Sequence, residues 1–194
     1  MEKQIYKTIE ESRTAYTDYV NAHINAIKDA FEIFANQLLM DILSSQNASD
    51  TEILLGVYMA RLEQSIEKHD ESKFSEEEFE AYRARFYPCK QDKELPKQEI
   101  EEKFEKAWEH HYSENSHHPE YYYTMFNKPI KMRVSDLAEM VLDWIAVSMV
   151  HKSNVLDWWA SGRKEKKKML LNYQFEIVDS FLNQHKDQLD FSEK

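Results

Sequence analysis

A histidine–aspartate doublet, His69-Asp70, stands among other histidines and acids of the types that bind divalent metals. One histidine, His23, precedes the doublet, and Asp143 follows it inside a nearly apolar segment. Imidazole nitrogens and carboxylate oxygens suit borderline or hard divalent metals, and a carboxylate can bridge two of them. The pattern therefore predicts a metal centre in preference to a set of unrelated core histidines.

Two further doublets, His110-His111 and His117-His118, lie between the first doublet and Asp143. Adjacent residues on a helix point about 100° apart, so only one member of each pair need face a common point. Apolar neighbours favour His111 as the buried member of its pair, whereas either or both of the second pair could reach a metal from a loop. The predicted metal ligands are His23, His69, Asp70, His111, His117, His118 and Asp143.

The stretch HDESK places Lys73 about one helical turn after Asp70. An ammonium at this spacing is near enough to touch a phosphate bound to the metal. The alternative is a surface ion pair between Lys73 and Glu77. We therefore predict catalytic roles for Asp70 and Lys73, with that alternative left open.

Three acids, Asp136, Glu139 and Asp143, share one stripe of a helix that is otherwise apolar. Burial of unpaired carboxylates is costly, so a cation must offset them. That cation is either a divalent metal or a basic side chain such as Arg133 or Lys73. We predict Asp143 as a metal ligand that faces His23, and Glu139 as a catalytic residue that orients a ligand or relays a proton.

The elements that must position these residues are helices. Two glycines and four prolines in 194 residues leave little material for hairpins, and apolar residues recur every three or four positions. We expect one all-α domain over residues 1–194 with about six helices. Their expected bounds are 4–44, 50 or 51 to 68, 75–85 from the capping-box spacing of Ser75 and Glu78, 97 to before Pro119, 135 or 136 to 150, and 165–186.

Composition limits the partners. The net charge of −11 argues against binding duplex nucleic acid, although a small anion remains compatible because a metal supplies local positive charge. The single cysteine, Cys89, excludes an intrachain disulfide and fits a reducing compartment. The N-terminus is too charged for a signal peptide, and the longest apolar stretch, 134–150, is too short to span a bilayer. We therefore expect a cytoplasmic protein without a membrane partner.

The order His23, His69-Asp70, Asp143 resembles the HD-domain superfamily of metal-dependent phosphohydrolases, which are all-α proteins, and HDESK resembles its HD-x-x-K stretch. The extra histidines resemble the subset that binds two metals, including cyclic-dinucleotide phosphodiesterases. More closely, HDESKFSEEEF, AWEHHYSENSHHPEYY and EMVLDW together look like an uncharacterised family of bacterial and phage proteins, over about residues 20–160.

This resemblance implies a hydrolase in which one or two divalent ions (Mn, Fe, Ni, Co, Mg or Zn) activate water toward a small nucleotide-like phosphoester. His23, His69, Asp70 and Asp143 would hold the first ion. Asp70 would bridge to a second ion at His111, His117 and His118. Lys73 would neutralise phosphate charge, and Glu139 would act on a ligand or a proton.

Two other interpretations remain. The first is a non-enzymatic acidic protein, of phage origin, that covers a basic partner or sequesters a nucleotide around a structural metal. Structural zinc sites are closed, usually four-coordinate and rich in cysteine, whereas this set has more than four N and O donors and no nearby cysteine. The set therefore favours an open, catalytic site. The second is a helical scaffold with ordinary core histidines.

Overall fold

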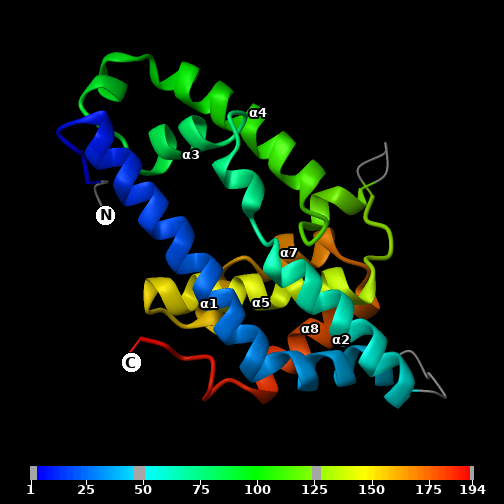
Figure 1. The fold of residues 1–194 in the computed structure, drawn as a ribbon. Coiled ribbons are helices and arrows are strands. Elements are labelled where there is room, and N and C mark those ends of the chain that lie inside the picture. The colour runs from blue at the N-terminus through cyan, green and yellow to red at the C-terminus, as the bar shows by residue number, and fades with distance from the viewer. Residues whose placement is uncertain (1–3, 46–50, 124–127, 193–194) are drawn as a thin grey trace. The chain divides into compact units, whose positions relative to one another are not determined.

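The computed structural model describes residues 4–45, 51–123 and 128–192. Over these ranges the chain forms eight α-helices and three 3-10 turns, without strands, which confirms the all-α class (Figure 1). The helices are α1 (Ile9–Ser44), α2 (Thr51–Glu67), α3 (Phe79–Phe86), α4 (Lys97–Glu114), α5 (Val134–His151), α6 (Val155–Ser161), α7 (Arg163–Met169) and α8 (Asn172–Gln184). The turns are η1 (Glu71–Phe74), η2 (Gln91–Glu94) and η3 (Pro119–Tyr122). The second helix was expected to start at position 50 or 51; Asp50 lies outside the described residues, and α2 begins at Thr51. None of the described helices is both long and apolar enough to cross a lipid bilayer.

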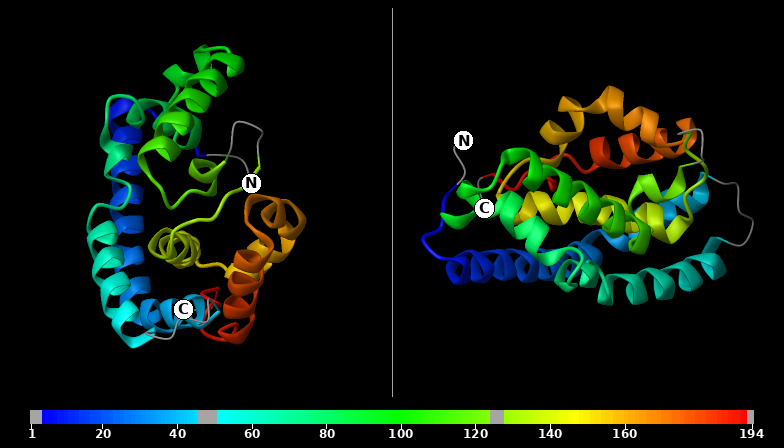
Figure 2. Two further views of the ribbon diagram at one scale, coloured as in Figure 1. Left: turned by 90° about the vertical axis from the view of Figure 1, so that its right-hand side faces the viewer. Right: turned by 90° about the horizontal axis from the view of Figure 1, so that it is seen from above.

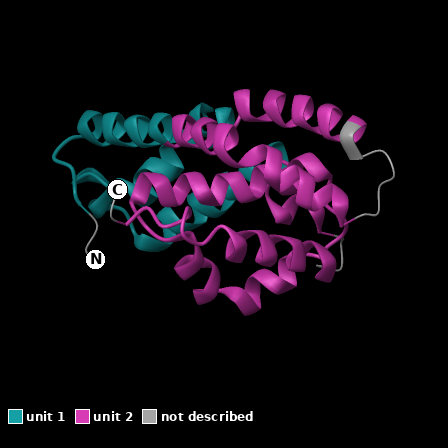
Figure 3. Cartoon of the chain, turned by 90° about the horizontal axis from the view of Figure 1, so that it is seen from below, with its two compact units in different colours: residues 1–22, 70–115 teal, residues 23–69, 116–194 magenta. Residues whose placement is uncertain are grey.

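The chain forms two compact units, each built from two segments (Figure 3). Unit 1 comprises residues 1–22 and 70–115, and unit 2 comprises residues 23–69 and 116–194. The chain passes between them inside α1, between His69 and Asp70, and between Asn115 and Ser116. Neither unit is one continuous piece of sequence.

Helix α5 lies at the centre of unit 2. Thirteen of its 18 residues are buried, as expected for a helix with almost no polar face. Figure 2 shows α5, in yellow, between α2 on one side and α8 on the other. Together with residues 26–43 of α1, these helices form the hydrophobic core of the unit. A carboxylate on α5 is therefore held in low-dielectric surroundings unless a polar partner reaches it.

A buried ion pair organises unit 1. The guanidinium of Arg83 on α3 bonds both carboxylate oxygens of Asp92, at 2.7 and 2.8 Å. Asp92 also accepts a hydrogen bond from the backbone N–H of Cys89 at 2.6 Å, and Arg83 donates to the hydroxyl of Ser12 on α1 at 2.9 Å. Paired charges with further hydrogen bonds are the form in which a buried arginine is tolerated. The pair therefore joins α3, η2 and the start of α1.

The predicted start of the third helix was wrong. Helix α3 begins at Phe79, and Ser75 instead closes the turn η1. Glu78, expected to complete a capping box with Ser75, turns its fully buried carboxylate to His110 and His111, at 2.8 Å from each. A charge-assisted contact with imidazole in a buried setting is stronger than the reciprocal backbone bond of a capping box at the surface.

The C-terminal region holds three helices where one was predicted, which raises the number above the six expected. Leu170 and Leu171 are extended, with ψ of 157° and 146°, and separate α7 from α8. Helix α6 ends before Gly162. The buried ammonium of Lys166 donates to the carbonyl of Trp158 at 2.5 Å. It thereby satisfies one of the carbonyls that the end of α6 leaves without a helical partner.

Candidate metal centre

The predicted site residues divide between the two units. Those of unit 2 are His23, His69, His117, His118, Glu139 and Asp143. Those of unit 1 are Asp70, Lys73 and His111. The boundary falls inside the first doublet, just after the end of α2, where Asp70 has a φ of 59°. Aspartate is among the residues that tolerate this left-handed conformation.

Three side chains of unit 2 bring their polar atoms to one point. Nε2 of His23 (α1) lies 3.2 Å from Nε2 of His69 (after α2) and 3.0 Å from Oδ1 of Asp143 (α5). The third edge, from His69 Nε2 to Asp143 Oδ1, is 3.7 Å. Ligand atoms at about 2.0–2.2 Å from one metal lie about 3–3.5 Å from each other. A point about 2.1 Å from all three atoms therefore exists close to this triangle.

A fourth donor, His117, comes from the loop between α4 and η3. His69, His117 and Asp143 each offer one ligand atom, and these atoms lie within 4.8 Å of one another. The His69 and His117 rings have centroids 4.5 Å apart. His118 is half-buried with its ring 4.3 Å from that of His117, and it is not a member of this three-residue group.

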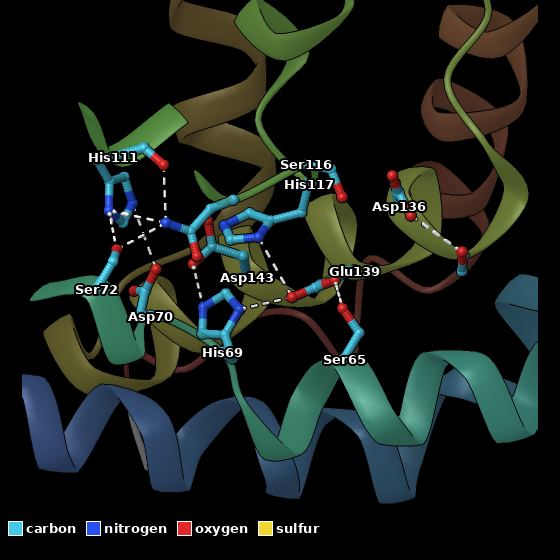
Figure 4. A network of polar contacts seen from close by, with 12 residues as sticks. Ser65, His69, Asp70, Ser72, His111, Ser116, His117, Asp136, Glu139 and Asp143 are labelled. Carbon is cyan, nitrogen blue, oxygen red and sulfur yellow. Dashed lines mark hydrogen bonds and ion pairs between the residues drawn. The ribbon is translucent and has the colours of Figure 1, made fainter. Parts of the chain in front are cut away.

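Glu139 holds two of these histidines from behind (Figure 4). Its Oε1 lies 2.9 Å from Nδ1 of His69 and 3.2 Å from Nδ1 of His117, and Ser65 donates to its Oε2. Burial raises the pKa of the Glu139 carboxyl, but the hydrogen bonds from His117 and His69 outweigh this and lower it to about 2. An ionised carboxylate only accepts hydrogen bonds, so it favours hydrogen on both Nδ1 atoms.

The carboxylates of Glu139 and Asp143 need positive charge nearby to balance them. Burial raises the pKa of Asp143, but its contacts with His23 and His69 bring that pKa well below the ordinary value. Two ionised carboxylates, Glu139 and Asp143, are offset either by two imidazolium ions or by one divalent ion. If His23 and His69 were the two imidazolium ions, their N–H groups would face each other across 3.2 Å, which like charges disfavour. With a divalent ion between them, the Nε2 atoms of His23 and His69 would instead both direct lone pairs at the ion.

Asp136, the third acid of the stripe, belongs to a separate network. It accepts from Nε of Arg133 at 2.9 Å and from the hydroxyl of Tyr122, so here the basic side chain is the partner. Arg133 also donates to the hydroxyl of Ser116 at 2.9 Å. The network joins residues 116–122 to the start of α5, and it therefore positions the loop that carries His117.

The predicted site residues of unit 1 contact one another and Glu78. His111 lies between two carboxylates, with Nδ1 2.8 Å from Glu78 and Nε2 3.3 Å from Asp70. Burial lowers the pKa of His111, but its hydrogen bonds with Asp70 and Glu78 outweigh this and raise it overall. The other oxygen of Asp70 accepts from Lys73 at 2.5 Å, so Lys73 pairs with Asp70.

Sequence reasoning missed two residues of these clusters. Glu78 stands in a run of three glutamates, and its spacing from Ser75 indicated a helix cap and not a contact with histidines. Ser65, however, precedes His69 by four positions, and side chains at this spacing lie on one face of a helix. That spacing is a signal by which Ser65 could have been found.

Fold and side chains together define an all-α protein whose unit 2 contains a buried cluster of residues of the metal-ligand type. Residues 12–187 match the family described as "Family of unknown function (DUF5662)", and the chain belongs to this family. The matched range includes every residue of the candidate centre. No curated protein and no solved structure matches the chain significantly.

Proposed function

We propose that this protein is a metal-dependent phosphohydrolase that acts on a small, nucleotide-like phosphoester. The observation that carries the proposal is the triangle of His23 Nε2, His69 Nε2 and Asp143 Oδ1, with edges of 3.0–3.7 Å. His117 adds a fourth donor from a different segment. Donors from four separate segments at one buried point are hard to explain by packing alone.

The donor set favours a catalytic ion. Three imidazoles and one carboxylate, without cysteine, suit metals such as Mn²⁺, Fe²⁺, Co²⁺, Ni²⁺ or Zn²⁺, and three or four protein ligands leave positions for water and substrate on an octahedral ion. When bound, such an ion lowers the pKa of a coordinated water and polarises a phosphoryl oxygen. The chain's own part is to hold the ligands: Asp143 supplies the anionic donor, and Glu139 orients His69 and His117.

The substrate class follows from charge and from the resemblance to the HD-domain superfamily. A net charge of −11 opposes binding to long duplex nucleic acid, whereas a small anion needs few cations. The order of His23, His69-Asp70 and Asp143 supports phosphoester hydrolysis by analogy with that superfamily. By the same analogy, the proposal includes Asp70 as a bridging ligand and Lys73 as a cation that neutralises phosphate charge.

The test compares Asp143→Asn with Asp157→Asn, an exposed aspartate on α6. Metal content is measured in protein purified without added metal, and release of phosphate or nucleoside monophosphate is measured on a panel of nucleotides and phosphodiesters with Mn²⁺, Mg²⁺, Ni²⁺, Co²⁺ or Fe²⁺. We expect Asp143→Asn to lose the metal and more than about 100-fold of the activity, beyond the range typical of residues that act only through a ligand. Asp157→Asn should match the wild type.

Equal background release by wild type and Asp143→Asn across the panel would contradict the hydrolase. If the wild type then still bound nucleotide and metal, the result would favour the sequestering protein. If it bound neither, it would favour the helical scaffold.

A further inference from the structure

Both oxygens of the Glu139 carboxylate are engaged within unit 2, and they are engaged differently. Oε1 faces Nδ1 of His69 at 2.9 Å and Nδ1 of His117 at 3.2 Å. Oε2 accepts from the hydroxyl of Ser65. The Glu139 side chain is 4% exposed, so water contributes little to holding it. Its orientation is therefore set by these three side chains.

We propose that Ser65 and Glu139 act as a tautomer lock, which keeps hydrogen on Nδ1 of His69 and His117 and reserves Nε2 of both rings for a metal. Ser65 is a positioning residue that acts through Glu139. The hydrogen bonds of Glu139 produce the lock whether or not a metal binds. Its role in metal binding rests on the proposed function.

The position of Ser65 explains why it has this effect. Ser65 lies in the last turn of α2, and His69 follows the helix in a turn, where its N–H donates to the carbonyl of Ile66 at 3.3 Å. One short segment thus contacts both oxygens of Glu139, the hydroxyl at Oε2 and the imidazole at Oε1 (Figure 4). A carboxylate held at one oxygen alone would rotate about its terminal bond, because that torsion is soft. Ser65 removes this freedom and leaves Oε1 directed at the two rings.

The consequence for the histidines follows from their hydrogen-bond inventory. A neutral imidazole has one donor nitrogen and one acceptor nitrogen, and the partner of one nitrogen decides the state of the other. A single carboxylate oxygen that accepts from two Nδ1–H groups therefore fixes both rings at once. For His69, the Nε2 so defined is the atom that lies 3.2 Å from Nε2 of His23 and 3.7 Å from Asp143.

A purely structural role for the Ser65 side chain predicts something different. The turn at the end of α2 uses the backbone carbonyl of Ser65, which accepts from the N–H of Lys68 at 3.0 Å. This bond survives Ser65→Ala. The substitution should therefore leave the helix intact while it releases Oε2 of Glu139, so that fold and tautomer respond separately.

The first measurement is the tautomer of His69 and His117 in metal-depleted protein, from long-range ¹H–¹⁵N spectra of ¹⁵N-histidine-labelled samples at neutral pH. His69→Gln and His117→Gln assign the signals. We expect the Nδ1–H form for both rings in the wild type and in Ser65→Thr, which keeps the hydroxyl. We expect Ser65→Ala and Glu139→Gln to show a growing Nε2–H population. Gln64→Ala, an exposed neighbour on α2, should match the wild type.

The second measurement is the Kd for Co²⁺ or Mn²⁺, with the melting temperature as a check on folding. Ser65→Ala should weaken binding by about 10-fold and Glu139→Gln by about 100-fold, the range typical of such partners, with Ser65→Thr restoring most of the loss. An Nε2–H tautomer of His69 in the wild type, or wild-type tautomers in Ser65→Ala, would overturn the lock. Wild-type protein that shows the Nδ1–H forms but binds no metal would leave the lock standing and refute the metal centre instead.

Discussion

Glu139 and Asp143 lie one turn apart on α5 and contact opposite nitrogens of the same ring, that of His69. Glu139 Oε1 is 2.9 Å from Nδ1, and Asp143 Oδ1 is 3.7 Å from Nε2. Glu139 accepts from the donor nitrogen of the ring, Nδ1. Asp143 lies near the acceptor nitrogen, Nε2, where a metal would bind both groups. Two of the three acids on this largely apolar helix are thus explained by one histidine and its neighbours.

Removal of His69 should abolish metal-dependent stabilisation. In the wild type, a metal at 100 times its Kd should raise the free energy of unfolding by about 2.7 kcal/mol, because it binds only the folded state. His69→Gln loses one edge of the triangle and one partner of Glu139, so we expect no rise in its melting temperature with added Co²⁺ or Mn²⁺. His151→Gln, at the exposed end of α5, is the control and should retain the wild-type shift.

Asp70→Asn should lower the pKa of His111. Burial opposes the charged form of His111, and Asp70 is the foremost group that favours it, so its neutralisation should bring the pKa down. Asparagine also tolerates the left-handed backbone at this position. A histidine titration by NMR gives the pKa, with Lys73→Met expected to move it the opposite way, because the ammonium of Lys73 lowers it. The metal content of Asp70→Asn tests the sequence-based prediction that Asp70 is also a ligand, and an unchanged content would contradict that prediction.

Asp92→Asn should destabilise the protein by about 3 kcal/mol at neutral pH, because it leaves the guanidinium of Arg83 buried without its main counterion. The stabilisation should also depend on pH. Arg83 holds the pKa of Asp92 well below its ordinary value of 3.8. The contribution is therefore fully present above about pH 3.8 and lost as the pH falls toward the lowered folded-state pKa.

Denaturant unfolding at several pH values measures both effects. The free energy of unfolding should fall more steeply on acidification in the wild type than in Asp92→Asn. Parallel profiles would show that Asp92 does not carry the expected acid sensitivity.

Tyr122→Phe should loosen the loop that carries His117. The substitution removes a buried hydrogen bond to the carboxylate of Asp136, worth about 1.5–3 kcal/mol when one partner is charged. We expect a loss of this size in unfolding free energy, together with weaker metal binding. Tyr121→Phe, which changes an exposed neighbouring tyrosine, should leave both quantities unchanged. Equal behaviour of the two variants would mean that the Tyr122 network does not position His117.

The chain's local pattern was enough to predict the all-α class and the buried helix α5. Apolar residues at helical spacing report which face of a segment is buried, and that information lies within a few neighbouring positions. For the same reason the acids at positions 136, 139 and 143 could be recognised as anomalous on an apolar helix. Residue type likewise predicts divalent-metal chemistry, and this stays a prediction.

The tertiary structure alone decided which partner each polar residue meets. Glu139 lies 70 positions from His69 along the chain, and His23 lies 46 positions from it, so no periodicity links them. The three acids of one stripe have different partners. Asp136 pairs with Arg133. Glu139 contacts the Nδ1 atoms of His69 and His117, and Asp143 contacts the Nε2 atoms of His23 and His69. Glu78, which was predicted to cap a helix, instead contacts histidines about 33 positions away along the chain. Local spacing determines which side chains are buried, whereas the packing of distant segments determines what offsets their charge, because a buried carboxylate is stabilised by whichever donor or cation the fold brings within bonding distance.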